Sequence, residues 1–333
     1  MTGSHQGSSG DGVSVLPVAL VLPVKNEAAA LPELFSALAL APVWPAEIAF
    51  SDAGSTDGTP DLIHAWWRDH GRPGVSMHVL ERPGALPGGG RNAGIGATRS
   101  EWIAFLDGGI RPEPDWLGAL YASAQAGGRD HAFGLCRFDA RGAIALAACA
   151  LTNGVGASAT VLPAAMFHRR VFERIGLLED HLRAAEDLVW LRRFALAYGS
   201  RHVCPAAVVH YTHYPDTLAG LFRKWFAFEK SSVAAGVRTR MRALYLVGGL
   251  TWLMLVAISP PAALGALLAY GVLRGVADPM RRSRNWRWWL GTPSAATLAP
   301  LCALVMDVGK VCGALAGLVQ SRNPPQGPAH PSP

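Results

Sequence analysis

The stretch Trp102-Ile103-Ala104-Phe105-Leu106-Asp107-Gly108-Gly109 decides the fold of this chain. Its first five residues are apolar, which predicts a strand that is buried on both faces. Asp107 then stands at the carboxyl end of that strand. Open α/β sheets bind their ligands at this end of their strands. We therefore expect Asp107 to face a ligand site.

Strands and helices alternate on both sides of this stretch. Shorter apolar runs predict further strands at 15–24, 47–50 and 76–80, and helices are expected at 28–40, 60–70, 93–98, 114–125 and 188–198. This alternation predicts an α/β fold with a mostly parallel sheet and right-handed crossovers. The stretch 130–165 is mixed and has no clear assignment.

The composition indicates that part of the chain lies in lipid. Half of the residues are hydrophobic and 16% are charged, below the roughly 25% of soluble domains. The net charge is +6, and the basic residues cluster at 222–242 and 281–287 beside apolar runs. This pattern favours an anionic membrane surface over nucleic acid. The cysteines form no CxxC pair, which indicates reduced thiols rather than a metal site.

The C-terminal third contains the membrane candidates. Residues 221–242 interleave aromatic and basic side chains, which predicts an amphipathic interfacial helix, with a helix packed on the globular domain as the alternative. Apolar segments at 243–259, 261–277 and 293–319 predict membrane-associated helices. If the first two are spans, their basic flanks both face the cytoplasm. The third contains Asp307 and Lys310, so its crossing is left open. Residues 1–14 and 320–333 are expected to be a disordered leader and tail.

Two polar motifs follow the first two strands. The first is Leu22-Pro23-Val24-Lys25-Asn26-Glu27 and the second is Ser51-Asp52-Ala53-Gly54-Ser55-Thr56-Asp57-Gly58-Thr59. Polar groups just beyond a strand can meet a ligand, and small residues let the backbone approach it. Asp52 can accept hydrogen bonds from that ligand, and an Asx-turn is the alternative reading.

Two more motifs carry charge at helix starts. Gly88-Gly89-Gly90-Arg91-Asn92 lacks the GxGxxG spacing of a dinucleotide loop. Its Arg91 can pair with a diphosphate and Asn92 can cap the next helix, whereas the alternative is a flexible turn with a solvated arginine. Ala185-Glu186-Asp187 opens another helix. The helix dipole favours carboxylates there, so a purely structural role is the alternative to a catalytic one.

In order and spacing these motifs resemble those of the inverting family 2 glycosyltransferases, which have a GT-A fold. The counterparts are Asn26-Glu27, Ser51 to Thr59, Arg91-Asn92-Ala93-Gly94, Asp107-Gly108-Gly109 and Glu186-Asp187. The resemblance covers residues 16–215, and the C-terminal hydrophobic helices resemble those of membrane-attached members. It implies a GT-A domain over 15–220 that binds its donor through Pro23, Asn26, Glu27, Asp52, Arg91, Asn92 and Asp107.

The resemblance also implies roles for the acidic residues. Asp187 would be the general base that takes the proton of the acceptor hydroxyl, and Glu186 would orient it or bind the acceptor. The family's Asp-x-Asp motif is incomplete here, because two glycines follow Asp107. Asp107 with the diphosphate and waters can hold Mg²⁺ or Mn²⁺, helped by His210, which the preceding apolar strand favours over His213. The alternative is a metal-independent site in which Arg91 or His210 neutralises the diphosphate.

The sequence therefore predicts a membrane-attached inverting glycosyltransferase of cell-envelope glycan or glycolipid synthesis. It would move a sugar from a nucleoside diphosphate-sugar to a lipid-linked or glycan acceptor at the cytoplasmic face of the cell (inner) membrane, with no nucleic-acid partner. The alternative is a catalytically degenerate homologue that binds a nucleotide sugar as a binding or scaffold protein. A nucleotidyltransferase is disfavoured, because the N-terminal region has no Gly loop rich in Lys and Arg.

Overall fold

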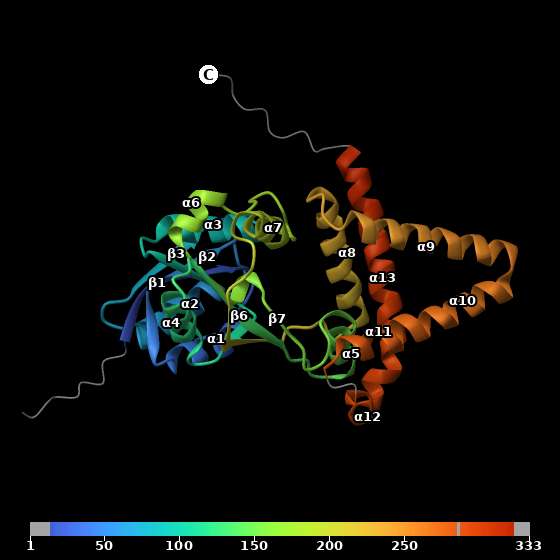
Figure 1. Cartoon of the computed structure of the whole chain (residues 1–333), viewed down its shortest axis with the longest axis horizontal. Helices are drawn as coiled ribbons and strands as arrows, with labels where there is room; N and C mark the ends of the chain where they lie inside the picture. Colours follow the sequence, from blue (N-terminus) through green and yellow to red (C-terminus); the bar gives the residue numbers. More distant parts are fainter. Residues whose placement is uncertain (1–13, 285–286, 323–333) are drawn as a thin grey trace, which may run out of the picture.

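The computed structural model describes residues 14–284 and 287–322. It has two parts, an α/β domain and a set of long C-terminal helices, which lie side by side in Figure 1. The predicted tail from 323 onward and the predicted leader, apart from Ser14, lie outside the described residues.

Nine strands form one sheet in the α/β domain. They are β1 (Ser14–Val24), β2 (Val43–Asp52), β3 (Ser76–Glu81), β4 (Trp102–Phe105), β5 (Ile110–Pro112), β6 (His131–Phe138), β7 (Ser158–Ala159), β8 (Ala165–His168) and β9 (Val203–Tyr211). Their order is β3-β2-β1-β4-β8-β6-β9-β5, and β7 pairs with β6. The predicted α/β class is confirmed. The sheet is parallel from β3 to β4 and mixed beyond it, because β8 runs antiparallel to both β4 and β6.

Helices cover both faces of this sheet. They are α1 (Leu31–Ala39), α2 (Thr59–His70), α3 (Pro87–Ala97), α4 (Trp116–Ala126), α6 (Arg169–Ile175) and α7 (Glu186–Tyr198). In β1, Val18, Leu20 and Leu22 contribute to the core on the face of α1, α2 and α4. Ala19 and Val21 contribute to the core on the other face, with α3, α6 and α7. The continuous apolar run of β1 follows from this burial on both faces.

The unassigned stretch 130–165 holds β6, β7, a short 3-10 helix (Leu162–Ala164) and helix α5 (Ala143–Thr152). Helix α5 is small and apolar, and it leaves the α/β domain to join the C-terminal helices (Figure 1). Its buried Ala147, Ala148 and Leu151 share a core with Leu221 and Met306. This core connects the two parts of the molecule.

The C-terminal part begins with α8 (Leu218–Ala234), which lies along the last long helix, α13 (Pro293–Arg322). A Cβ atom built on Gly309 would lie 2.9 Å from the carbonyl oxygen of Phe222, and one on Gly313 would lie 2.3 Å from that of Phe226. From the first contact to the second, the residue number rises by four in both helices. The two helices therefore run in the same direction. Glycine is needed at both positions because any side chain would collide with the backbone of α8.

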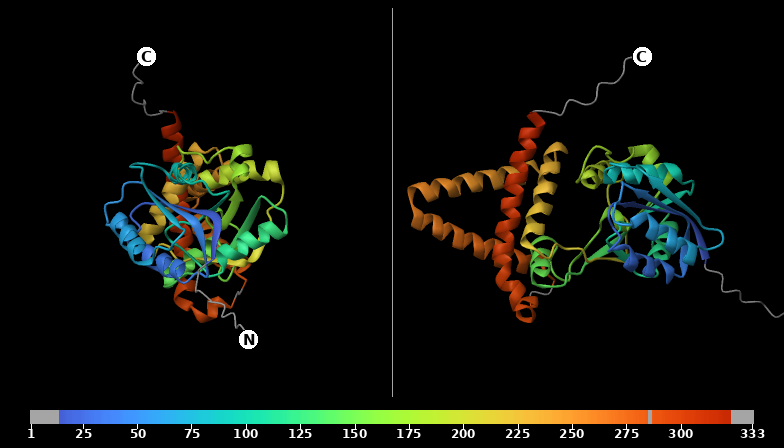
Figure 2. Two further views of the ribbon diagram at one scale, coloured as in Figure 1. Left: turned by 90° about the vertical axis from the view of Figure 1, so that its left-hand side faces the viewer. Right: turned by 180° about the vertical axis from the view of Figure 1, so that it is seen from behind.

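Two helices project from this pair as a hairpin. They are α9 (Thr239–Ile258) and α10 (Pro260–Val272), and α10 continues through a π-helical turn (Leu273–Ala277) into α11 (Asp278–Arg282). The hairpin points away from the α/β domain, on the far side of α13 (Figures 1 and 2). A short helix, α12 (Trp288–Gly291), precedes α13.

Within the described residues, three helices are long and apolar enough to cross a membrane: Thr239–Ile258, Pro260–Arg282 and Pro293–Gln320. They coincide closely with the predicted segments 243–259, 261–277 and 293–319. They differ in burial, because the apolar windows of the first two are 6% and 11% buried in the protein and that of the third is 50% buried. Most of the hairpin is thus exposed, apart from contacts of α9 and α10 with each other and with α13, whereas α13 is held against α8 and α5.

The single helix predicted over 221–242 is broken in the structure. Helix α8 ends at Ala234, and α9 begins at Thr239 after Gly236 and Arg238, both with positive φ. Arg242 in the first turn of α9 turns back to Glu229 of α8. The break lets the chain turn sideways from the end of α8 into the hairpin (Figure 1), so the basic residues 238–242 lie at the base of the hairpin.

Candidate active site

The site lies where the carboxyl ends of β1, β2 and β4 meet. Val24 pairs with Asp52 at the ends of β1 and β2, and Val21 pairs with Phe105 at the end of β4. Asp107 follows β4 by two residues. Asp52 and Asp107 therefore lie at the same edge of the sheet.

Arg91 of α3 joins two of the predicted carboxylates. Its Nη2 donates to Asp107 Oδ1 at 2.6 Å and its Nη1 donates to Glu186 Oε1 at 2.7 Å. Arg91 is 3% exposed. Burial alone would lower its pKa, but the charges of Asp107 and Glu186 outweigh burial and raise it. Arg91 is therefore a permanent buried cation that holds the end of β4 to the start of α7.

The glycines before Arg91 belong to a helix, not to a loop. Helix α3 begins at Pro87, so the helix start predicted at residue 93 is too late. A Cβ on Gly88 would lie 2.0 Å from the carbonyl oxygen of Glu179, and one on Gly90 would lie 3.0 Å from Pro23 Cβ. The glycines let the first turn of α3 lie directly against β1 and the segment before α7.

Asn92 does not cap α3, because it lies inside the helix. Its Nδ2 donates to the carbonyl oxygen of Leu178 at 2.8 Å, and its Oδ1 accepts from the Leu178 amide at 3.0 Å. This pair of hydrogen bonds fixes the segment between α6 and α7. Asn92 thus lies at the site as predicted, but it acts on the backbone of another segment.

The first two motifs hold each other. Asn26, with φ 54°, donates its amide to Ser55 Oγ at 2.8 Å and accepts from the Thr56 amide at 2.8 Å. The Glu27 amide donates to Thr59 Oγ1 at 2.9 Å. Asp52 accepts from the Ser55 amide and hydroxyl of its own loop, which is the Asx-turn arrangement. These contacts order the predicted donor loops.

Glu27 lies against the glycines that follow Asp107. A Cβ on Gly108 would lie 2.9 Å from Glu27 Cγ, and one on Gly109 would lie 3.0 Å from Nδ1 of His213. Burial raises the pKa of Glu27, His213 opposes this shift, and Asp107 adds to it. The two glycines therefore leave room for the side chains of Glu27 and His213.

The two candidate histidines have different surroundings. His210 Nδ1 is 2.5 Å from Asp139 Oδ2 and its Nε2 is 3.2 Å from Glu113 Oε1. His213 Nδ1 lies 3.0 Å from the carbonyl oxygen of Gly109. The geometry thus brings His213 next to the Asp107 loop and places His210 in another cluster, so the metal role predicted for His210 has no support here.

Glu186 and Asp187 form the first turn of α7, after Ala185 with φ 70°. Burial raises the pKa of both carboxyls, and Arg91 opposes the shift in each case. Asp107 further raises the pKa of Asp187. Glu186 is buried and bound to Arg91, whereas Asp187 is half-buried and accepts a hydrogen bond from the Leu188 amide. Of the two, Asp187 has the freer carboxylate.

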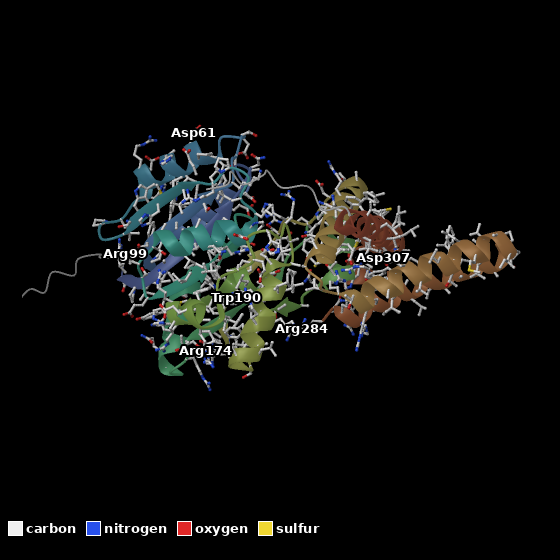
Figure 3. All side chains as sticks on the ribbon, turned by 90° about the horizontal axis from the view of Figure 1, so that it is seen from above. Asp61, Arg99, Arg174, Trp190, Arg284 and Asp307 are labelled. Atoms are coloured by element: carbon white, nitrogen blue, oxygen red, sulfur yellow. The ribbon has the colours of Figure 1, made fainter. Side chains whose placement is uncertain are left out.

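The aromatic residue beside this turn is structural. Trp190 is fully buried, donates to the carbonyl oxygen of Gly176 at 2.9 Å, and stacks on Phe172 and Phe194. Figure 3 places it within the α/β domain, as expected for core packing.

A metal ion does not fit the described side chains without additional ligands. Among residues 14–284 and 287–322, no three His, Cys, Asp or Glu side chains are grouped to hold one. Asp107, the carboxylate expected to bind the metal, has Oδ1 in contact with Arg91.

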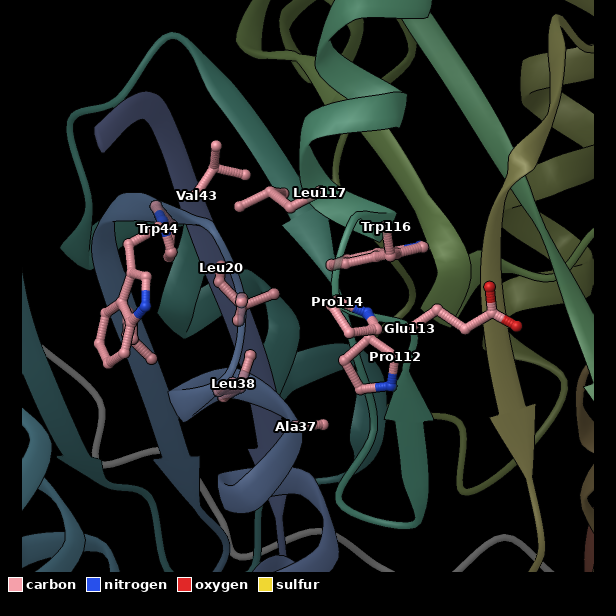
Figure 4. A pocket seen from close by; sticks show the side chains of 13 residues that line it. Leu20, Ala37, Leu38, Val43, Trp44, Pro112, Glu113, Pro114, Trp116 and Leu117 are labelled. Atoms are coloured by element: carbon pink, nitrogen blue, oxygen red, sulfur yellow. The ribbon is translucent and has the colours of Figure 1, made fainter. Parts of the chain in front are cut away.

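The enclosed cavity in Figure 4 is separate from these residues. Its lining includes Leu20, Ala37, Trp44 and Trp116, and none of the predicted donor or catalytic residues. Its volume is about 20 Å³, which is room for about one water. It is a packing gap in the core beneath α1 and α4.

Part of the chain matches a known protein family. Residues 19–142 match the family Glycosyl transferase family 2. An 82-residue stretch is 42% identical to the succinoglycan biosynthesis protein ExoO of Rhizobium meliloti (strain 1021). That stretch is 25% of this chain and spans only 22% of the length of ExoO.

Solved structures share the fold. The mannosyltransferase PcManGT from Pyrobaculum calidifontis, in complex with GDP-Man and Mn²⁺, has a TM-score of 0.52 at 17% identity, over 93% of this chain and 88% of that one. S. aureus TarS 1–349, in complex with UDP-GlcNAc, has a TM-score of 0.48 at 13% identity, over 92% and 91% of the two chains. The match to the mannosyltransferase structure confirms the predicted GT-A fold.

Proposed function

Because residues 19–142 match the family Glycosyl transferase family 2, we propose that the protein transfers a sugar, with inversion, from a nucleoside diphosphate-sugar to an acceptor at a membrane surface. The observation that carries this proposal is the buried bridge of Arg91. It joins Asp107, at the donor end of the sheet, to Glu186, beside the free carboxylate of Asp187. A proton acceptor and a donor edge are thus held together.

In this mechanism Asp187 accepts the proton of the acceptor hydroxyl. The hydroxyl oxygen attacks the anomeric carbon as the bond from that carbon to the diphosphate oxygen breaks. A single displacement from the opposite face inverts the configuration. Glu186 stays bound to Arg91 and keeps the first turn of α7 in place.

The donor lies, in this proposal, over the edge made by Asn26, Asp52 and Asp107. The ordered contacts between the two loops support this location, because a preformed site loses less entropy on binding. Arg91 lies beneath the edge, with its charge kept by its carboxylate partners. His213 supplies a second group that can carry positive charge next to the Asp107 loop.

The hairpin of α9 and α10 inserts into the bilayer in this proposal, which favours a lipid-linked acceptor. Helix α9 has 20 residues, about 30 Å at 1.5 Å per residue, enough to cross the hydrocarbon core. Arg238 and Arg240 lie at the start of the hairpin, and Arg281 and Arg282 follow α10. Both ends of the hairpin lie on its side toward the α/β domain (Figures 1 and 2), so the positive-inside rule supports a cytoplasmic location for that domain.

Helix α13 lies along the base of the hairpin instead of crossing the bilayer. Half of its apolar window is already buried against protein. Its Asp307 binds Arg274 and Lys310, and it lies near the point where the hairpin leaves α13 (Figure 3). A charged cluster of this kind is least costly near the headgroups.

A donor screen on the full chain in nanodiscs tests this function. UDP- and GDP-sugars are offered with lipid extract, in parallel arms containing Mg²⁺, Mn²⁺ or EDTA, and products are separated by mass spectrometry. Calorimetry measures donor binding in the same samples. A glycosylated product supports the proposal. Donor binding without product in any arm favours the degenerate binding protein, and neither binding nor product overturns both.

A further inference from the structure

The segment between α6 and α7 carries the catalytic turn and is held at two points. At one end, Asn92 of α3 holds Leu178. At the other end, the hydroxyl of Ser231 on α8 holds Ala184. Ser231 Oγ accepts from the Ala184 amide at 2.9 Å and donates to the Ala184 carbonyl oxygen at 3.0 Å. Ala184 is directly followed by Ala185-Glu186-Asp187.

The Ser231 contact is unusual for a serine within a helix. Such a hydroxyl ordinarily bonds a carbonyl oxygen of the preceding turn of its own helix. The neighbouring Ser232 does this, donating to the Phe228 carbonyl oxygen at 2.9 Å. Ser231 instead uses both its donor and its acceptor on one residue of the α/β domain, although it is 8% exposed.

Ser231 is itself positioned by the membrane helices. Two residues before it, Glu229 is 1% exposed and binds Arg242 at 3.3 Å and Arg238 at 3.5 Å. Both arginines lie where α9 begins. On the other side of α8, Gly313 and Gly317 of α13 allow close backbone contact. The position of the Ser231 hydroxyl therefore depends on α9 and α13.

We propose that Ser231 is a positioning residue that fixes the Glu186–Asp187 turn through Ala184 and so makes the alignment of the proton acceptor depend on the docked membrane helices. This inference rests on the proposed transferase function for its kinetic consequence, but not for its structural one. Ala185 has φ 70°, a conformation that a non-glycine residue holds only when its surroundings enforce it. Ser231 supplies part of that enforcement.

The test compares Ser231→Ala with Ser232→Ala in the full chain in nanodiscs. Both changes remove a hydroxyl from a buried serine of the same helix, and alanine favours the helix more than serine does. Hydrogen exchange of residues 182–188 is measured first. We expect exchange there to rise in Ser231→Ala and to stay unchanged in Ser232→Ala.

Turnover gives the second readout. A small displacement of a reacting group costs up to about a hundredfold in rate. We therefore expect kcat of Ser231→Ala to fall about tenfold to a hundredfold, with the KM for the donor unchanged, and Ser231→Thr to recover turnover because it keeps the hydroxyl. Ser232→Ala should match the parent.

The outcomes separate the two proposals. Unchanged exchange at 182–188 in Ser231→Ala, or equal effects of the two alanine variants, overturns the positioning role while leaving the transferase function intact. A parent protein that makes no product with any donor overturns the function, and the exchange measurement still reports whether Ser231 holds the turn.

Discussion

Arg91 donates to Glu186 at 2.7 Å across 95 residues of sequence. Both side chains are buried, so neither charge has water as an alternative partner. The pair connects α3, whose first turn contains three glycines, to α7, whose first turn contains the proposed base. The integrity of the site thus depends on one ion pair between two α-helices.

Removing Arg91 should destabilise the protein strongly. Arg91→Ala leaves Glu186 buried without its cation, which costs about 3–5 kcal/mol for comparable pairs. We expect a large fall in the midpoint of thermal unfolding in detergent. The double variant Arg91→Ala/Glu186→Gln should recover part of the loss, because the second change removes the unpaired charge.

Arg82→Ala is the matched control for this experiment, because the side chain of Arg82 is exposed and donates to the carbonyl oxygen of the neighbouring Glu81. It should leave the unfolding midpoint unchanged. If Arg91→Ala leaves the unfolding midpoint unchanged, as this control should, the ion pair does not contribute to stability.

Asp187→Asn should abolish transfer while donor binding is retained. The amide keeps the size of the side chain but cannot accept the proton, and general-base catalysis contributes about 10²–10⁴-fold. Product formation and calorimetric donor affinity are measured on the same preparation. Asp180→Asn, in the same segment but exposed, is the control and should stay fully active. Full activity of Asp187→Asn would refute its assignment as the base.

The acid side of the pH profile should reflect the raised pKa of Asp187. Burial favours the protonated carboxyl, so the base is lost at a higher pH than an exposed aspartate would show as the pH falls. Asp107 contributes to this shift, so Asp107→Asn should move the acid limb of kcat to lower pH at saturating donor. If the acid limb does not move, the titration that causes it belongs to another carboxyl, such as Glu186.

Gly109→Ala should reduce both stability and activity. Its Cβ would lie 3.0 Å from His213 Nδ1, and overpacking of this kind costs about 1–3 kcal/mol. Thermal unfolding and turnover are compared with those of Gly96→Ala, where no atom lies within 4 Å of the new Cβ. His213→Ala in the Gly109→Ala background should restore stability, since it removes the collision.

Gly313→Ala should loosen α8 from α13. The new Cβ would lie 2.3 Å from the backbone carbonyl oxygen of Phe226, so the helices must separate. We expect a lower unfolding midpoint and lower turnover. The control is Gly265→Ala on the exposed α10, where the added Cβ meets nothing within 4 Å. Equal behaviour of the two variants would show that close packing of α8 on α13 is dispensable.

Local pattern was enough to predict the sheet edge and the hairpin. The apolar run ending at Asp107 is a buried strand, and the prolines at 260–261 mark the turn between α9 and α10. Both features depend on neighbouring residues, which is why sequence alone reveals them. The fold implied by the motifs is confirmed by the mannosyltransferase structure, and residues 19–142 match the implied family.

Features that depend on distant contacts were not predictable. The sequence of Gly88 to Gly90 is typical of a loop. These glycines are needed in a helix because Glu179 and Pro23, which are distant in the sequence, lie too close for a side chain. The sequence favours His210 over His213 because His210 follows a short apolar strand. The register of β5 and β9 pairs His210 with Arg111, so the residue beyond the strand end reaches Gly109. The residues around Ser231 do not indicate its contact, because its partner, Ala184, lies 47 residues away in the sequence.

The same-direction contact between α8 and α13 has a consequence for how the molecule is made. Helix α8 cannot settle until α13, more than fifty residues later in the chain, has been synthesised and laid beside it. The α/β domain leaves the ribosome long before that. If Ser231 positions the Glu186–Asp187 turn as proposed, that turn stays incompletely held in newly made chains until α8 and α13 have docked.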